Sequence, residues 1–387
     1  MSNLEASVNR RAFIRISGLT GAAAVAAACS PAAAPAGSGG PAPTTGTGGA
    51  SKAPWENEWD ELIAAAKKEG KLGIQTLTGV GYRKYVEAFE KTFGIAAEHR
   101  ADASASIWGQ KIIKEQEAGI FALDVAVVPP NSALSVVRPT GAWVPIKPLI
   151  FRPDVVDNKF WRDGFAARFM DKERNLAFNW EFDVRHSVSI NASFVKEEEI
   201  KEFPDLLKPQ FKGKIISDDV RTGGMFLPFT AVRKKWGDDM ARKYLTEQGL
   251  VFNRDQRQIA ENLVRGRFPI AFGSRPTAMT EFQQQGLGKD IKWLDIESVG
   301  FVPNTSIFAV KNAPHPNAAK LFINWFLTKE GQSVWAKLAP NNSRRSDVPP
   351  GLPDSVAASG KKYLVGDSWD NKDLIPEIQK LARQLLD

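Results

Sequence analysis

The chain has 387 residues but only one cysteine, Cys29. A single thiol excludes an internal disulfide framework, a multi-cysteine zinc site and a thiolate-bound iron–sulfur cluster. Histidine is almost as scarce, with three in the whole chain, and this argues against a histidine-rich metal centre. We therefore expect neither a resident metal nor another cofactor.

The chain also lacks a strong charge bias. Its 51 basic and 44 acidic residues leave a net charge of +7, and a nucleic-acid-binding protein would normally gather such an excess in one patch. Hydrophobic residues make up 43% and charged residues 25%, the balance of a globular protein. We expect a soluble, monomeric body of about two domains with no nucleic-acid partner.

No apolar run is long enough to span a membrane. Residues 16–28 follow Arg10-Arg11 and are weakly apolar, but a membrane helix needs about 20 residues. The paired arginines resemble a twin-arginine export signal, and Ala26-Ala27-Ala28-Cys29 resembles a bacterial lipoprotein cleavage box. We expect residues 1–28 to be the signal and Cys29 the site of lipid attachment outside the cytoplasm. The alternative is that Cys29 is an incidental small residue of a signal peptide.

Residues 29–52 have the composition of a linker. They are rich in Ser, Pro, Ala, Gly and Thr, and Lys52 carries the only charge. Such a segment cannot bury a hydrophobic core, so it predicts a flexible tether between a membrane anchor and the folded body, residues 53–387.

The folded body alternates between helical and strand patterns. Helices are expected at 59–69, 82–93, 107–118 and 317–327, and strands at 72–76, 124–128, 178–191, 215–216 and 268–272. This alternation predicts an α/β protein with mostly parallel sheets. Ligands of such sheets bind at the carboxyl ends of the strands, so the loop after the first strand, with Thr78, Gly79, Tyr82 and Arg83, is a candidate site wall.

Four short blocks carry a family resemblance. They run from Ala65 to Lys71, from Asp205 to Lys214, from Ala260 to Gly266 and from Pro314 to Trp325. In this order, behind a lipoprotein-like signal, they resemble the extracytoplasmic solute-binding proteins of ABC importers, in the branch that includes ferric-iron binders.

The resemblance implies a two-lobe periplasmic-binding-protein fold of the class II type, with the ligand in the cleft between the lobes. We expect two crossover strands near 179–187 and 293–305. Lobe 1 would then comprise residues 53–180 and 300–387, and lobe 2 residues 186–295. The implied role is that of a binding protein, not an enzyme, which hands a small solute to membrane permease subunits.

The ferric-iron binders of this family use two adjacent tyrosines after the strand that corresponds to 268–272. This chain has Gly273-Ser274-Arg275 there, and none of its four tyrosines adjoins another. An arginine cannot ligate a metal cation, whereas its guanidinium grips carboxylate or phosphate in a fork. The sequence therefore favours an anionic solute over direct Fe(III) binding.

Other residues at strand ends fit the same chemistry. Most of the expected binding residues have a basic, small or polar side chain in a turn after a strand, and two would form an aromatic wall. They are Arg221, Thr222, Gly223, Gly224, Arg254, Arg257, Ser274, Arg275, Asn304, Trp108 and Trp180. The alternative for each arginine is a structural salt bridge. The 11 tryptophans also leave sugar stacking open.

The sequence leaves several other functions open. The chain could be an iron-binding importer subunit, a sensor that signals to a membrane kinase, or a secreted lipoprotein hydrolase. The hydrolase is the weakest of these, because the sequence has no Gly-x-Ser-x-Gly elbow and no His-Glu-x-x-His helix.

Overall fold

The computed structural model describes residues 52–102, 105–221, 226–302, 305–339, 341–357, 360–365 and 374–387. The export signal, Cys29 and residues 30–51 of the tether lie outside these ranges. So do four predicted binding residues, Thr222, Gly223, Gly224 and Asn304. Within the described ranges, no helix combines the length and apolar character that crossing a bilayer requires.

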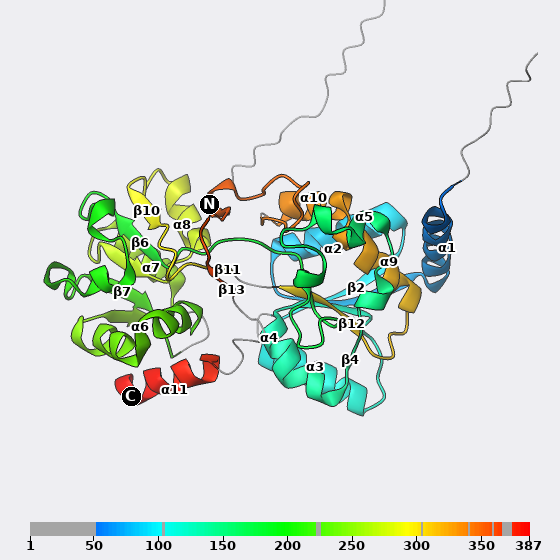
Figure 1. Ribbon diagram of the computed structural model, residues 1–387, viewed down its shortest axis with the longest axis horizontal. Helices are drawn as coiled ribbons and strands as arrows, with labels where there is room; N and C mark the ends of the chain where they lie inside the picture. Colours follow the sequence, from blue (N-terminus) through cyan, green and yellow to red (C-terminus); the bar gives the residue numbers. More distant parts are fainter. Residues whose placement is uncertain are drawn as a thin grey trace, which may run out of the picture. The chain divides into compact units, whose positions relative to one another are not determined.

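The first sheet has six strands. Its order is β2 (Ala96–Ala101), β1 (Lys71–Thr76), β3 (Val125–Val128), β12 (Ser306–Val310) and β4 (Trp143–Val144), and β5 (Phe178–Asn179) also pairs with β12. Strands β1, β2 and β3 run parallel to one another, and β12 runs antiparallel to each of its neighbours (Figure 1).

The second sheet has five strands in the order β10 (Ile291–Leu294), β6 (Val188–Asn191), β9 (Ile270–Phe272), β7 (Ile215–Asp218) and β8 (Val251–Asn253). β7 is parallel to β8 and β9, whereas β6 is antiparallel to β9 and β10. A small third sheet pairs β11 (Phe301–Val302) with β13 (Leu364–Val365).

The expectation of mostly parallel sheets holds for only part of each sheet. The chain reaches the antiparallel strand β6 from β5 of the first sheet, and it reaches β12 from the second sheet by way of β11. Neither strand therefore follows a helical crossover within its own sheet. A right-handed helical crossover makes a strand parallel to its predecessor, and a strand that arrives from elsewhere has no such constraint.

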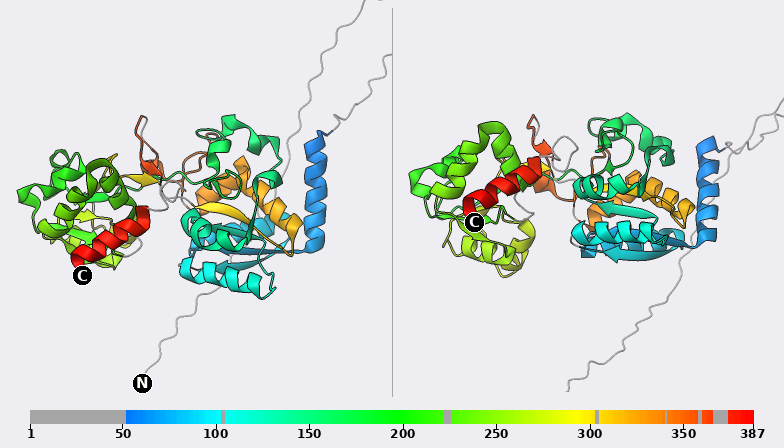
Figure 2. Two further views of the ribbon diagram at one scale, coloured as in Figure 1. Left: turned by 60° about the horizontal axis from the view of Figure 1, so that its bottom comes forward. Right: turned by 90° about the horizontal axis from the view of Figure 1, so that it is seen from below.

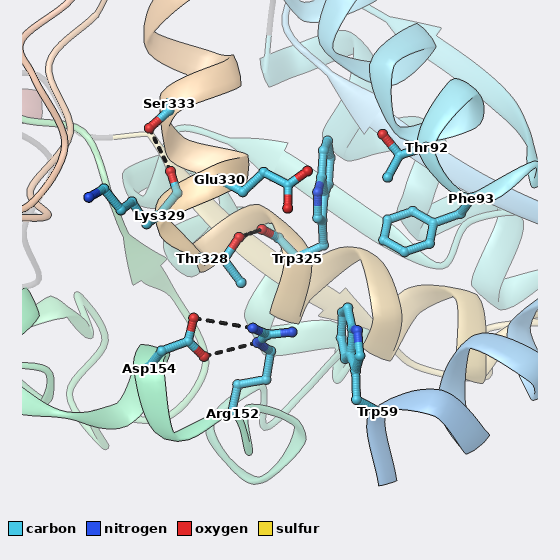
Figure 3. Close-up of a pocket in the computed structure, with 10 residues that line it drawn as sticks. All are labelled: Trp59, Thr92, Phe93, Arg152, Asp154, Trp325, Thr328, Lys329, Glu330 and Ser333. Atoms are coloured by element: carbon cyan, nitrogen blue, oxygen red, sulfur yellow. Dashed lines mark hydrogen bonds and ion pairs between the residues drawn. The ribbon is translucent and has the colours of Figure 1, made fainter. Parts of the chain in front are cut away.

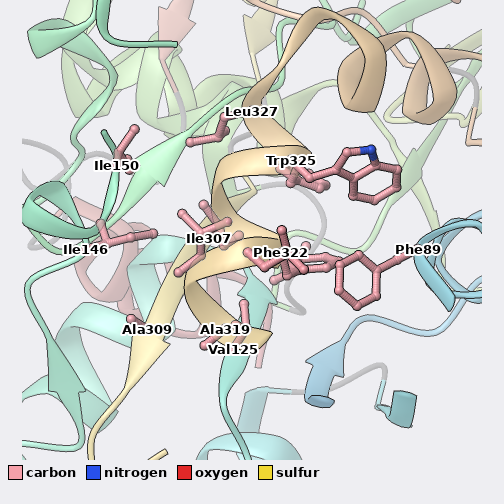
Figure 4. Packing of buried hydrophobic residues seen from close by; sticks show 14 of the residues in the cluster. Phe89, Val125, Ile146, Ile150, Ile307, Ala309, Ala319, Phe322, Trp325 and Leu327 are labelled. Atoms are coloured by element: carbon pink, nitrogen blue, oxygen red, sulfur yellow. The ribbon is translucent and has the colours of Figure 1, made fainter. Parts of the chain in front are cut away.

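Within the described residues, five long helices accompany the first sheet. They are α1 (Pro54–Glu69), α2 (Val80–Phe93), α3 (Ala105–Glu117), α9 (Pro316–Leu327) and α10 (Lys329–Leu338). α9 packs against α1, α10 and β1 and buries Leu321, Phe322, Trp325 and Phe326, as the sequence predicts. Figure 4 shows Phe322 and Trp325 packed with Phe89 of α2 in this core.

Two of the sequence blocks meet at the start of α9. The Glu69 carboxylate, at the end of α1, accepts hydrogen bonds from the backbone N–H groups of Asn317 (3.1 Å) and Ala318 (2.7 Å). Gly70 closes α1 with a φ of 72°, a left-handed conformation that glycine adopts without strain. The family resemblance therefore lies partly in residues that join α1 to α9.

The helices of the second sheet are α6 (Phe226–Glu247), α7 (Gln256–Val264) and α8 (Pro276–Gln284). The C-terminal helix α11 (Leu374–Leu386) packs along α6, and its Ile378, Leu381 and Ala382 join the core of the second sheet (Figure 2). α11 thus lies with the second sheet and not with the first-lobe part, 300–387, to which the sequence analysis assigned it.

The predicted long strand 178–191 is two short strands. β5 ends at Asn179 and β6 begins at Val188, and between them only isolated bridges join Glu181 to Ser343 and Arg185 to Phe301. The segment 180–187 therefore leaves one sheet and enters the other, close to the first predicted crossover, but it is not a continuous strand.

Candidate functional site

A polar cluster lies at the carboxyl ends of β7, β8 and β9. Its centre is Asp219, directly after β7, whose side chain is only 3% exposed. Arg221 binds both carboxylate oxygens of Asp219, through Nε at 2.8 Å and Nη2 at 2.9 Å, and Arg254 binds through Nε at 3.0 Å. Burial alone would raise the pKa of Asp219, but these arginines hold it below its usual range.

The two arginines differ in what else they contact. Arg221 also donates from Nη1 to Asp387 at 2.9 Å, close to the end of α11, and its side chain is 25% exposed. The side chain of Arg254 is 66% exposed, and no hydrogen bond to either of its Nη atoms is found within the described residues. Asp219 thus fixes Arg254 by its Nε edge and leaves its outer nitrogens available.

The end of β9 contributes hydroxyl groups and a further arginine. The hydroxyls of Ser274 and of Ser189, from β6, lie 2.5 Å apart and are buried. Arg275 is exposed, and its charge acts on Asp218, a residue only 5% exposed at the end of β7. Burial raises the pKa of Asp218, and Arg275 partly offsets this rise.

Arg257 lies in the first turn of α7. Asp255 caps this helix by accepting hydrogen bonds from the backbone N–H groups of Arg257 and Gln258. The exposed guanidinium of Arg257 lies 5.8 Å from the ring centre of Phe282. The second sheet therefore places Arg221, Arg254 and Arg275 just beyond the ends of adjacent strands, with Arg257 in the first turn of α7.

The candidate residues of the first sheet are less closely grouped. Thr78 and Gly79 are exposed in the loop between β1 and α2, and Arg83 is exposed with Glu87 at 3.7 Å. Tyr82 is half-buried, packs edge-on against Trp335 at 5.0 Å, and has its pKa raised by burial and by the charge of Glu181.

Two predicted aromatic walls are core residues instead. Trp108 and Trp180 are both 0% exposed and belong to the hydrophobic clusters around the first sheet. Trp180 lies edge-on to Phe326 at 4.6 Å and to Trp335 at 6.0 Å. Neither ring therefore has a face that a ligand could reach. Packing in the core stabilises a large aromatic side chain next to a sheet more than contact with solvent does.

An acidic pair between β5 and β6 was not predicted from the sequence. Glu181 is 5% exposed and Asp183 is 0% exposed. The side-chain amide of Asn341 donates to Glu181 at 3.1 Å, and the backbone N–H of Asn342 donates to Asp183 at 2.7 Å. Among the described residues, no donor reaches the second carboxylate oxygen of either residue. The Glu-x-Asp pattern could have indicated this pair, because the side chains of residues two apart on an extended segment point to the same side.

A metal centre built from carboxylate, imidazole or thiolate groups finds no support in the described ranges, which contain no cluster of three or more such side chains placed to hold an ion. Two of the four tyrosines, Tyr85 and Tyr244, are buried in hydrophobic cores. The chemistry that the grouped arginines and serines offer is hydrogen bonding to an anionic or polar solute.

Comparison with known proteins gives a family and a fold. The model of a family described as bacterial extracellular solute-binding protein matches residues 84–360. No curated protein matches the chain by sequence.

Solved structures of similar fold cover most of the chain. FutA (IdiA) of Trichodesmium, in complex with iron and citrate, is 14% identical with a TM-score of 0.65, over 82% of this chain and 99% of that chain. Iron-bound HitA of Pseudomonas aeruginosa is 15% identical with a TM-score of 0.61, over 82% and 99%. AfuA of Actinobacillus pleuropneumoniae, with bound fructose-6-phosphate, is 18% identical with a TM-score of 0.59, over 82% and 98%. At these identities the likeness establishes the two-lobe fold.

Proposed function

This chain belongs to the bacterial extracellular solute-binding proteins, and on that basis we propose that it captures a small anionic solute and delivers it to the permease of an ABC importer. The family places the protein outside the cytoplasm and gives it a binding role. The anionic nature of the solute is our inference from the residues at the strand ends of the second sheet.

One observation carries the proposal. Asp219 holds Arg254 by its Nε edge, and the Nη nitrogens of that exposed side chain have no partner within the described residues. Arg275 is exposed at the end of the neighbouring strand, beside the buried Ser189–Ser274 hydroxyl pair. Fixed guanidinium groups suit carboxylate or phosphate, because both the charge and the planar fork match.

The ligands of two structural neighbours agree with this chemistry. FutA of Trichodesmium holds citrate together with iron, and AfuA holds fructose-6-phosphate. Citrate carries carboxylates and fructose-6-phosphate carries a phosphate. The fold therefore accommodates anions of this size.

Direct Fe(III) binding through phenolates is the weaker candidate. Tyr85 and Tyr244 are 2% and 0% exposed, and the Tyr363 hydroxyl donates to Asp295 at 2.8 Å. Tyr82 is half-buried, and burial raises its pKa, which disfavours the phenolate that Fe(III) requires. Iron would then bind only as a complex with an anion.

Capture would follow the mechanism of two-lobe binding proteins. We assign lobe 1 to residues 53–180 together with the returning segment from 300, and lobe 2 to 186–295 together with α11. Closure is a shift of population toward the closed state, and a solute drives it only as far as it binds that state more tightly. Arginines of lobe 2 would supply part of that difference.

We also propose that the protein is anchored at the membrane. Cys29 would carry the lipid after removal of residues 1–28, and residues 30–52 would serve as the tether. Metabolic labelling with radioactive palmitate tests this directly. A Cys29→Ala chain that still takes up label, or that remains membrane-bound, would remove the anchor from the proposal.

The central experiment is a binding screen of the body 53–387 by isothermal titration calorimetry. The ligands are citrate, fructose-6-phosphate, inorganic phosphate, sulfate, Fe(III), Fe(III)–citrate and neutral sugars. We expect an anion to bind, and we expect Arg254→Ala and Arg275→Ala each to weaken it by about ten-fold or more, the loss of a charged hydrogen bond.

Arg265→Ala is the matched control, since Arg265 is exposed at the opposite, C-terminal end of α7 and pairs with Glu261 at 2.9 Å. Binding of uncomplexed Fe(III) alone, or affinity that Arg254→Ala and Arg275→Ala leave unchanged, would refute the anionic solute. Growth of a deletion strain on the identified solute separates the importer from a sensor, and turnover of that solute would instead identify an enzyme.

A further inference from the structure

A cavity opens beside α1 and α10, among the helices of the first sheet. Its volume is about 560 Å³, within the range of small-molecule sites, and Figure 3 shows the side chains around it. None of the binding residues expected from the sequence lines this cavity. The cavity is therefore separate from the arginines at the strand ends of the second sheet.

Aromatic side chains form its apolar walls. Trp59 of α1 is half-buried and meets Phe93 of α2 edge-on, with ring centres 6.2 Å apart. Trp325 of α9 stacks on Tyr85 at 5.1 Å, so its faces are used in the core and only an edge reaches the cavity. These rings offer surface for the C–H groups of a ligand.

Two N–H donors of the residues that line the cavity have no hydrogen-bond partner within the described ranges, one of them buried and the other on a charged side chain. Trp325 is 2% exposed, and its Nε1 has no hydrogen-bond partner among the described residues. A buried indole N–H normally finds an acceptor. The Arg152 guanidinium lies 4.5 Å from the ring centre of Trp59 and binds Asp154 through Nε and Nη2, so its position is fixed while Nη1 has no partner in the described ranges.

The charges around the cavity balance. Arg152 and Lys329 are basic, and Asp154 and Glu330 are acidic. A lining of equal positive and negative charge does not select an ion of either sign. It does suit hydroxyl groups, because each hydroxyl donates to a carboxylate and accepts from an N–H.

We propose that this cavity binds a short neutral saccharide. Pyranose C–H faces would lie against Trp59 and Phe93, and the sugar hydroxyls would bind Glu330 and Arg152 Nη1. The ligand is either a free oligosaccharide or the end of a cell-envelope glycan, since both present the same chemistry. This site does not depend on the anionic solute proposed above.

The test titrates the full chain with maltose, cellobiose and chitobiose and, separately, with glucuronate and with sheared envelope glycan, followed by calorimetry and saturation-transfer NMR. We expect at least one neutral disaccharide to bind in the range of about 0.1–1 mM. Binding of the disaccharide alone indicates a free sugar, and much tighter binding of the polymer indicates an envelope glycan.

Two variants locate the binding. Thr92 is exposed at the cavity rim and bonds the carbonyl of Ala88 in its own helix, so Thr92→Phe narrows the cavity without removing a tertiary contact. Thr246→Phe is the matched control, because Thr246 is exposed and bonds the carbonyl of Arg242 in the same way on α6.

Thr92→Phe should weaken the saccharide at least ten-fold, Thr246→Phe should not, and Glu330→Gln, which keeps the side-chain shape, should weaken it by about ten-fold. The proposal is overturned if no neutral saccharide binds at about 10 mM, if only the charged sugar binds, or if Thr92→Phe leaves binding unchanged. Loss of anion binding at Arg254 has no bearing on any of these outcomes.

Discussion

Asp183 lies next to Glu181 in the buried segment between β5 and β6, and burial together with the charge of Glu181 raises the pKa of Asp183 to about 8. Burial is the larger cause and the charge of Glu181 the second, while the backbone N–H of Asn342 and the charge of Arg185 act in the opposite direction. The raised pKa favours the protonated form of the Asp183 carboxyl group, next to a second acid on the segment that joins the two sheets.

This pair makes folding stability depend on pH. An unfolded Asp titrates near pH 3.9, so the folded state binds the Asp183 proton more tightly than the unfolded state does. The contribution is fully present below about pH 4 and is lost as pH rises through about 8. Asp183→Asn keeps an acceptor for Asn342 and should gain stability relative to the wild type as pH rises, by a few kcal/mol at pH 9.

Melting temperatures of both proteins between pH 5 and 9 check this prediction. Glu181→Gln serves as the second variant, because removing its charge should shift the pH-dependent loss to lower pH. If the difference between Asp183→Asn and wild type stays constant over this range, the acid is not protonated in the folded protein.

Asp219 gives a prediction that opposes simple electrostatics. Removing a negative charge next to Arg221 and Arg254 should strengthen binding of an anion if charge alone decided the affinity. We expect the reverse for Asp219→Asn, a loss of about ten-fold, because the arginines lose the carboxylate that fixes them.

Calorimetry with the solute from the screen measures this effect. Asp255→Asn is the control, since it removes one negative charge at the same strand ends while asparagine still caps α7. Tighter binding by Asp219→Asn would show that the charge of Asp219 matters more than its positioning of the arginines.

The sequence predicted the regular elements well where turn signals bounded them. The strand expected at 72–76 and the helix expected at 82–93 appear as β1 and α2, with small shifts at their ends. These boundaries were predictable because Gly70 and Gly94 adopt the left-handed conformation that ends a helix. The position of α11 could not be predicted in this way, since an amphipathic pattern does not say which core it covers.

The segment 180–187 shows why part of the site was not predictable. Its apolar residues alternate, which indicates a strand, but Phe182 is half-buried while Glu181 and Asp183 are buried. Phe182 is half-covered by Arg162 and Arg344, which lie 5.1 and 4.7 Å from its ring. The burial of an acid depends on partners such as Asn342, which is far away in sequence.

Glu69 should matter more for stability than its position suggests. It caps α9 through Asn317 and Ala318, across 248 residues of sequence. Glu69→Ala should cost about 1–2 kcal/mol in the free energy of unfolding, the usual cost of losing a cap. Glu61→Ala, on the exposed face of the same helix, should cost about 0.5 kcal/mol or less. Urea denaturation measures both, and equal losses would contradict the capping role.

Gly73 is the position in β1 where a side chain is least tolerable. A Cβ there would lie 2.2 Å from the carbonyl oxygen of Ala122. The N–H of Gly73 donates to the Asp124 carboxylate, and the carbonyl of Gly73 accepts from the backbone N–H of Asp124. The strand cannot shift without breaking these bonds, so Gly73→Ala should destabilise the protein by about 3 kcal/mol, at the upper end of the cost of overpacking.

Gly109→Ala is the control for that substitution. Gly109 lies within α3, where a Cβ would meet Val137 at an ordinary 3.4 Å. Alanine favours a helix over glycine by up to about 1 kcal/mol, so this variant should be as stable as the wild type or more stable. Since both changes add the same methyl group next to the first sheet, a Gly73→Ala protein as stable as Gly109→Ala would show that β1 and residue 122 are not in contact.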